Sequence, residues 1–330
     1  MAAAQFAAAL SQEELAAIGS WRNPKTGWYE PASKSTLHRV IQYTDTEQLQ
    51  GVLDRYSGCR NKQLSALAAD GKRIRGANRN GDSHYETVTL VEHGSGIPKA
   101  SRSFYKDGQE LDATRQLLSE IDVAGRVITL DALHCTFESV DLILDAKADY
   151  MLTLKDNTSL QLDKVQSMPW HNHRVRRWEE ELTKAHGRIE QRRIEVLAVD
   201  DPKRFDFKQV RQAYRIERDR EVIKEANSAS TEVMFGITSV GAERADAQQL
   251  LKWNRGHWSV ENLNHHIRDR TFLEDACLTR TSNGPSNRAM CNNIALALIF
   301  HHSSLESVPQ ALRHFNLNRK EAFAAVFSPT

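Results

Sequence analysis

The chain has 330 residues, 40% of them hydrophobic and 26% charged, so it is long enough to bury a substantial core. Its formal net charge of +1 excludes a general electrostatic attraction to nucleic acid. No apolar stretch approaches the ~20 residues that cross a bilayer, and no signal core begins the chain, so we expect a cytoplasmic protein. The four cysteines include no C-x-x-C pair, which argues against a disulfide framework and a cysteine zinc site.

The first predicted unit is helical. The segment 11–56 is mainly helical in pattern, and after a turn-rich stretch at 22–31 the residues 36–41 carry apolar side chains at about 3.6-residue spacing. We assign residues 1–60 to a helical N-terminal region.

The next segment, residues 64–155, contains five short apolar runs separated by turns, which predict five strands. Helical periodicity at 109–122 lies between the third and fourth runs, and at 137–146 between the fourth and fifth. Three strands that can pair antiparallel, followed by two strand-helix-strand crossovers, predict an α/β fold: a mixed sheet with flanking helices.

Strand-like alternation returns at residues 172–239, and the chain from 245 onward is mainly helical, with long candidates at 255–270 and 286–302. The predicted division is therefore residues 61–171 for the first part of the core, 172–240 for a β-rich insertion and 241–330 for the helical C-terminal part of the core. Basic runs within 173–220, taken alone, are typical of solvated surface faces.

Two aspartates follow apolar runs. Asp70 comes directly after residues 64–69 and Asp131 after 127–130, so each is predicted to lie at the end of a strand. If these strands are neighbours, the interstrand spacing of ~4.8 Å would let the two carboxylates share or bridge divalent metal ions. The alternative for either residue alone is a turn or a helix cap.

A third acid lies in the sequence HWSVENLNHHIRD. At 100° per residue, His257, Glu261, Asn264 and Arg268 fall on one sector of a helix, apart from an apolar stripe. The polar sector would then face an active site. Periodicity alone favours the alternative, a surface helix with i,i+4 polar pairs.

These segments, in their order, resemble the ISAs-type insertion-sequence transposases, which include the H-repeat-associated proteins. The resemblance runs through nearly the whole chain. It is carried by LAADGKRIRGA at 67–77, ITLDALHCT at 128–136, ADYMLTLKDN at 148–157, HGRIEQRR at 186–193, RGHWSVEN at 255–262, DRTFLEDA at 269–276 and SNGPSNRAMCNNIALAL at 282–298.

The resemblance implies a ribonuclease H-like fold and a DDE transposase that cuts and transfers DNA strands at insertion-sequence ends. It implies a catalytic, metal-binding triad of Asp70, Asp131 and Glu261 with Mg²⁺, for which Mn²⁺ would substitute. Two such ions bridged by acids suit in-line attack on phosphorus. The implied partners are the inverted-repeat ends, target DNA and a second copy in a synaptic homodimer, at the bacterial nucleoid and not at a membrane.

The resemblance also suggests DNA contacts. In related transposases the glutamate helix carries tyrosine, arginine and lysine at fixed spacing, and Asn254, His257 and Arg268 occupy those places here. The candidates for DNA contact are Lys72, Arg73, Arg75, His134, Lys155, Arg188, Arg255, His257 and Arg268. Surface solubility is the alternative for the basic residues, and a helix-start role is the alternative for His134.

Relatives usually carry a further helical stretch before the segment matching residues 6–39, so part of the end-binding region is expected to be missing. This leaves two alternatives to transposition. One is a truncated or repurposed DNA-binding protein. The other is a host metal-dependent nuclease of the same fold, which cuts DNA without joining it.

The paired histidines, such as His265 with His266, lack zinc-site spacing and are expected to be packed or solvent-facing.

Overall fold

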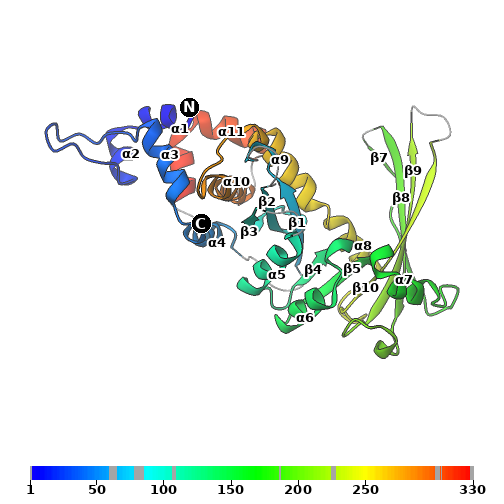
Figure 1. The fold of residues 1–330 in the computed structure, drawn as a ribbon. Helices are drawn as coiled ribbons and strands as arrows, with labels where there is room; N and C mark the ends of the chain where they lie inside the picture. The colour runs from blue at the N-terminus through cyan, green and yellow to red at the C-terminus, as the bar shows by residue number, and fades with distance from the viewer. Residues whose placement is uncertain are drawn as a thin grey trace.

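A computed structural model describes residues 2–58, 65–77, 85–105, 109–185, 187–223, 228–301, 305 and 307–327. The molecule is elongated, with helices from both termini at one end, a sheet in the centre and a long β arm at the other end (Figure 1). The predicted domain boundary between residues 60 and 61 lies outside the described residues. Among those described, no helix has the length and apolar content needed to span a membrane.

The central sheet has the predicted fold. Its strands are β1 (Ala66–Arg73), β2 (Glu86–Glu92), β3 (Pro98–Phe104), β4 (Val127–Leu130) and β5 (Asp149–Leu154). They run in the order β3-β2-β1-β4-β5. β1, β2 and β3 pair antiparallel as a meander, whereas β1, β4 and β5 pair parallel across helical crossovers. This is the strand order of a ribonuclease H-like sheet, so the predicted fold class is confirmed.

Alternating residues of β1 face two different helical layers. Leu67 and Ala69 pack into the core beneath α5 (Glu110–Glu120) and α6 (Phe137–Asp145). Ala66 packs with α8 (Ala247–Gly256), and Ala68 packs with Val260. Because both faces of the strand are buried, its sequence is an apolar run without polar alternation.

The same sheet continues into the β arm. After α7 (Ser159–Gln166) come β6 (Arg176–Glu179), β7 (Thr183–Ala185), β8 (Arg188–Ala198), β9 (Gln212–Val222) and β10 (Ser230–Thr238). β10 pairs antiparallel with β5, so the arm and the central sheet share one ladder of strands. Gly236 allows this close pairing, since a Cβ there would lie 2.3 Å from the Leu152 carbonyl oxygen. The division into separate domains stays a prediction.

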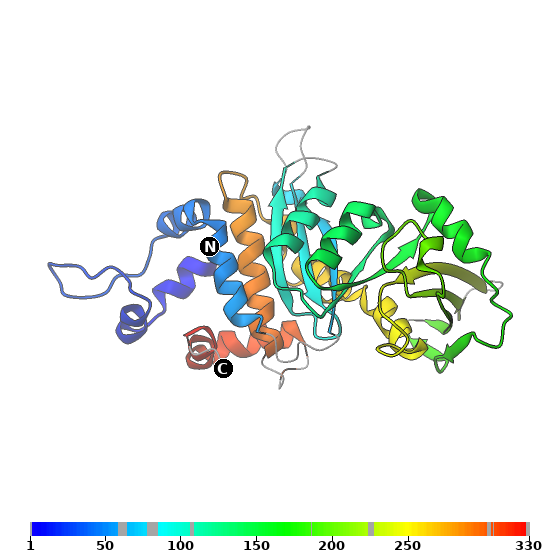
Figure 2. The ribbon, with the colours of Figure 1, turned by 90° about the horizontal axis from the view of Figure 1, so that it is seen from below.

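The N-terminal helices pack against the C-terminal ones, as both views show (Figure 2). The N-terminal helices are α1 (Ala2–Ala8), α2 (Gln12–Ala17), α3 (Lys34–Tyr43) and α4 (Thr46–Tyr56), and the last helices are α10 (Gly284–His301), α11 (Val308–Leu317) and α12 (Arg319–Phe327). The Asn287 amide of α10 donates to the carbonyls of Ile41 and Thr44, and so satisfies the open C-terminal end of α3.

Candidate active site

The three predicted carboxylates line one cavity. Asp70, Asp131 and Glu261 all border a space of about 560 Å³. Ala68 of β1 is paired with Thr129 of β4, so Asp70 and Asp131 lie two residues further along neighbouring parallel strands. Glu261 reaches the cavity from the helical segment above the sheet. The structure therefore brings together three residues that are separated by 61 and 130 positions in the chain.

The predicted position of Asp70 needs correction, because it is not at a strand end. β1 continues to Arg73, and Asp70 pairs with Thr89 of β2. On its other side β1 pairs with β4 only as far as Ala68, and β4 ends at Leu130. Asp70 is therefore held by β2 on one side while the other side opens into the cavity.

A fourth acid, Glu110, lies beside Asp70 and was missed by the sequence reasoning. A Cβ on Gly71 would lie 2.4 Å from the Glu110 carboxyl carbon, so the glycine makes room for this side chain. The buried His134 has its Nε2 3.1 Å from Glu110 Oε1, and its backbone N–H donates to Asp131 Oδ1 at 3.3 Å. Only 1% of His134 is exposed, so it contacts the acids from inside the protein. The predicted contact of His134 with DNA is therefore wrong.

Burial raises the pKa of Asp70 to about 7, and repulsion from Glu110 and Asp131 adds to the effect. Hydrogen bonding from the Gly71 backbone and the charge of His134 oppose the rise. Like charges crowded around Asp70 form a site that a cation would stabilise. Their hard oxygen donors suit Mg²⁺ or Mn²⁺. Among the described residues, however, no three His, Cys, Asp or Glu side chains already form a closed metal-ligand set.

The raised pKa of Asp70 predicts a pH dependence of stability. The pKa is about 7 in the folded protein against an ordinary value of 3.8. The folded state therefore holds this proton more tightly, and the stability gained at low pH is lost as the pH rises from about 4 to about 7. In EDTA, we expect Asp70→Asn to show a smaller fall in Tm than the wild type between pH 5 and pH 8. Identical falls for both proteins in thermal melts would contradict this.

Glu261 belongs to a π-helical segment, not to the continuous α-helix predicted for residues 255–270. α8 ends at Gly256, η5 (Val260–His265) is π-helical, and α9 (His266–Arg270) follows. π-helical turns occur mainly as short insertions at functional sites. The wider turn changes the angular spacing: His257 and Glu261 still line one cavity, whereas Arg268, beyond the turn, is buried away from it.

His257 lies between the helix and the sheet. Its Nδ1 is 3.1 Å from the Thr129 hydroxyl, which is 2.9 Å from Nε2 of His93. Burial lowers the pKa of both imidazoles, that of His93 to about 3. The ring contacts the sheet through Nδ1, and the residue lines the same cavity as the three acids, so the predicted phosphate contact of His257 stays a prediction.

Gly256 makes room for this row of side chains. A Cβ there would lie 2.3 Å from Nδ1 of His93, whose ring is held by Thr129 and cannot easily swing away. We expect Gly256→Ala to reduce the free energy of unfolding by about 1–3 kcal/mol, as overpacking does. Gly51→Ala in α4 is the matched control, because no atom lies within 4 Å of its Cβ position. Urea denaturation that shows Gly256→Ala to be as stable as the wild type would contradict the prediction.

The remaining candidates for DNA contact differ in their surroundings. Lys155 follows β5, is exposed, and lines the same cavity as the carboxylates. Arg188 is exposed at the first residue of β8. Arg255 lines a different cavity of about 1060 Å³ and is paired with both carboxylate oxygens of Glu180, at 2.9 and 3.0 Å. Of these three, the structure brings only Lys155 together with the acids.

The basic segment after Asp70 takes part in packing. Lys72 is only 6% exposed, and its Nζ lies 2.6 Å from Asp269 and 3.4 Å from Asp275. Arg73 pairs with Glu86 at 3.1 Å, whereas the Arg75 side chain is 82% exposed. Lys72 is thus buried against the segment 269–275. The prediction that it contacts DNA is therefore wrong.

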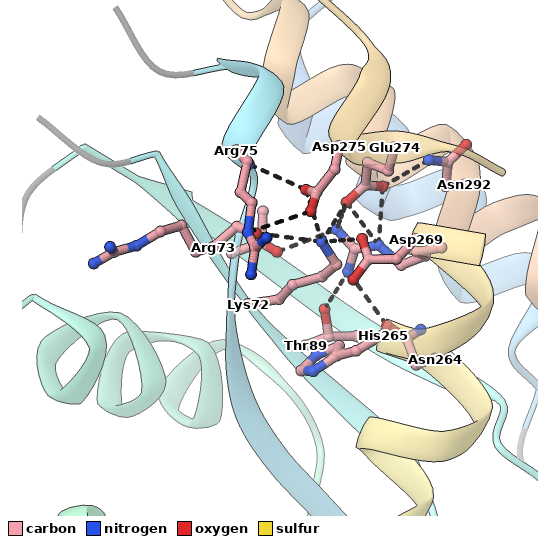
Figure 3. A network of polar contacts seen from close by, with 12 residues as sticks. Lys72, Arg73, Arg75, Thr89, Asn264, His265, Asp269, Glu274, Asp275 and Asn292 are labelled. Carbon is pink, nitrogen blue, oxygen red and sulfur yellow. Dashed lines mark hydrogen bonds and ion pairs between the residues drawn. The ribbon is translucent and has the colours of Figure 1, made fainter. Parts of the chain in front are cut away.

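Arg268 is fully buried. It donates to Glu274, to the hydroxyls of Thr87 and Thr89, and to Asn264. With 0% exposure it cannot reach a phosphate, which corrects the prediction from the family register. Figure 3 shows the surrounding network of charged side chains between β1 and the helices.

The basic runs of the arm are largely balanced by acids. Arg193 pairs with Glu217 at 2.7 Å, and Arg218 with Glu190 at 2.7 Å. In the antiparallel register Arg193 lies directly opposite Glu217, whereas Arg218 lies opposite Arg192 and reaches Glu190 diagonally. These strands therefore do not present a continuous basic stripe.

Comparison with known proteins places this geometry in context. The family described as Transposase DDE domain matches residues 57–298. The chain is 25% identical over 244 residues to YncI of Escherichia coli O157:H7, whose name assigns it to the transposases; the match covers 71% of this chain and 61% of that protein. It is also 25% identical over 245 residues to YhhI of Escherichia coli K12, whose name links it to the H repeat and to transposases, covering 71% and 63%.

The matched region thus spans less than two thirds of these relatives. Among solved structures, endonuclease V of Streptomyces avermitilis is similar at 12% identity and a TM-score of 0.25, covering 75% of this chain and 96% of that one. A similarity that low adds nothing to the fold assignment, which rests on strand order and pairing.

Proposed function

We propose that this chain, which belongs to the Transposase DDE domain family, cuts and joins DNA strands at the ends of an insertion sequence. The observation that carries the proposal is the meeting of Asp70, Asp131 and Glu261 around one cavity, on a ribonuclease H-like sheet. Family membership supports transposase chemistry in general. We further propose that the reaction uses Mg²⁺, that the three residues bind it, and that the chain is specific for the ends of an insertion sequence.

Asp70 and Asp131 would hold a shared Mg²⁺ or Mn²⁺, and Glu261 would hold a second from across the cavity. When bound, such ions activate a water or a 3′-hydroxyl and stabilise the leaving oxygen. The protein's own contribution is placement: the β1–β4 register fixes the two aspartates as neighbours, and His134 restrains Asp131 and Glu110. Such preorganisation is a main source of rate enhancement in phosphoryl transfer.

DNA would approach the cavity where Lys155 is exposed, since an ammonium there can pair with a phosphate without displacing a protein carboxylate. Arg188 on the arm is a second proposed contact. We propose that two copies act together on the two inverted-repeat ends and on target DNA, in the bacterial cytoplasm at the nucleoid. Lys155→Met should weaken DNA binding and reduce the salt slope of log K by about 1. An unchanged slope in fluorescence anisotropy titrations would contradict that role.

The deciding experiment uses purified full-length chain and DNA that carries the inverted repeats flanking its gene. In Mg²⁺ or Mn²⁺ we expect cleaved ends and joined products on a sequencing gel. Cleaved but never joined DNA would instead support the host-nuclease alternative. Binding without cleavage would support a repurposed DNA-binding protein.

A further inference from the structure

Glu274 lies at the centre of a buried charge network. Only 1% of it is exposed. Its carboxylate accepts from Arg268 Nη2 at 2.6 Å and Nε at 2.9 Å, and from Asn292 Nδ2 at 2.6 Å, with Lys72 Nζ at 3.7 Å. Figure 3 shows Lys72, Asn292 and Glu274 converging from separate elements. A carboxylate buried this deeply stays charged only when it is paired with cations and hydrogen-bonded, as Glu274 is.

The partners of Glu274 come from the elements that carry the candidate active-site acids. Lys72 is two residues after Asp70 in β1, and Arg268 is seven residues after Glu261 and lies in α9. Between them, Nδ1 of His265 in η5 lies 3.6 Å from Asp70 Oδ2. Glu274 is therefore one of two acids that join the strand of the first acid to the helical segment of the third: it binds Arg268 and lies 3.7 Å from Lys72, while Asp269 of α9 pairs with Lys72 at 2.6 Å.

The backbone before Glu274 is strained. Leu273 has φ 52° and ψ 43°, a left-handed conformation that is unfavourable for a branched side chain, and its own side chain is 60% exposed. Such conformations persist where the surrounding contacts over-determine them. Here the turn places the side chain of Leu273 toward solvent and that of Glu274 in the charge network.

Among the described residues Glu274 has no substitute as the acid partner of Arg268, whereas Lys72 has a nearer acid in Asp269, at 2.6 Å. Arg268 and Lys72 are both buried cations. The other two acids near Lys72 have partly exposed side chains, 38% for Asp269 and 28% for Asp275, and no ion pair joins either to Arg268 among the described residues. Removing Glu274 would leave the Arg268 guanidinium uncompensated next to η5.

We infer that Glu274 is a positioning residue: by fixing the buried Arg268 of α9 where it bonds to Thr87 and Thr89 of the sheet, it sets the distance between Asp70 and Glu261 and thereby the affinity of the site for metal. This inference rests on the proposed function. Residues that orient metal ligands commonly change metal affinity or activity by about 10–100-fold when replaced. Glu274 orients the elements that carry the candidate ligands Asp70 and Glu261, although it does not line their cavity.

The test measures Mn²⁺ binding to the full-length chain directly, by the electron paramagnetic resonance signal of free Mn²⁺, alongside cleavage kinetics. For Glu274→Gln we expect a Kd for Mn²⁺ raised about 10–100-fold and a lower kcat, with KM for DNA within about twofold of wild type. The matched control is Asp275→Asn, the adjacent and more exposed acid, which should bind Mn²⁺ within about twofold of wild type. Equal Mn²⁺ affinity for wild type and Glu274→Gln would overturn the inference.

A second variant separates positioning from stability. Arg268→Met/Glu274→Leu removes both charges and replaces them with apolar side chains, a change that often preserves folding. We expect this protein to melt near the wild-type temperature while Mn²⁺ affinity stays low. Recovery of both properties would overturn the inference and leave Glu274 with a role in stability alone. Wild-type chain that does not bind Mn²⁺, or whose Mn²⁺ affinity is unchanged by Asp131→Asn, would overturn the proposed metal site and this inference with it.

Discussion

Replacement of Asp131 by asparagine is expected to lower the rate of strand cleavage by about 10³-fold or more, because metal ions contribute several kcal/mol to such reactions and each 1.4 kcal/mol is a factor of ten. The amide keeps the size of the side chain but loses the charge that a divalent cation requires. Asp131 also caps η2 (Ala132–His134) by accepting from the His134 backbone, and asparagine serves equally well as a cap. The fold should therefore survive the change while the chemistry does not.

The measurement is single-turnover cleavage of inverted-repeat DNA in Mg²⁺, with the thermal melt of each variant recorded in parallel. Asp141→Asn is the matched control, since Asp141 lies on the exposed face of α6 and pairs with Lys208 at 2.7 Å. It should cleave at the wild-type rate. Full activity of Asp131→Asn would refute the metal site, whereas equal losses in both variants would indicate damage to α6 or to the fold.

The site was only partly predictable from sequence, for reasons that can be traced to particular residues. Short apolar runs and helical periodicity are local signals, so the strands and crossovers could be read directly, and parallel crossovers made Asp70 and Asp131 neighbours. Glu261 required the family resemblance, because periodicity alone favours a surface helix. No local sequence pattern predicts that Glu110 lies at the site. Gly71, which makes room for it, is equally typical of a turn.

One error comes from the regular helix assumed for residues 255–270. At 100° per residue, His257, Glu261 and Arg268 share a face; His257 and Glu261 do line one cavity, but the π-helical turn at Val260–His265 changes the spacing and Arg268 is buried away from that cavity. Sequence patterns also give the charge of a residue without its burial. Lys72 and Arg268 were therefore predicted to contact phosphate, although both have carboxylate partners inside the protein.

Arg268→Met is expected to reduce the free energy of unfolding by about 3–5 kcal/mol, the usual result of removing one partner from a buried ion pair. Methionine fills much of the space, but Glu274 would then remain buried at 1% exposure with its strongest partner gone. The hydroxyls of Thr87 and Thr89 in β2 would lose their donors as well. Urea denaturation measures the change, and Arg75→Met is the control: its side chain is 82% exposed, so the loss should be below about 0.5 kcal/mol.

The same variant separates the two roles that have been considered for Arg268. If the family register were right and the guanidinium held a phosphate, Arg268→Met would weaken DNA binding and reduce its salt dependence while leaving stability nearly unchanged. The buried position leads to the opposite expectation: a large loss of stability, with the DNA affinity of the folded fraction and its salt slope unchanged. Stability within about 0.5 kcal/mol of wild type, together with a shallower salt slope, would show that Arg268 turns outward to meet DNA.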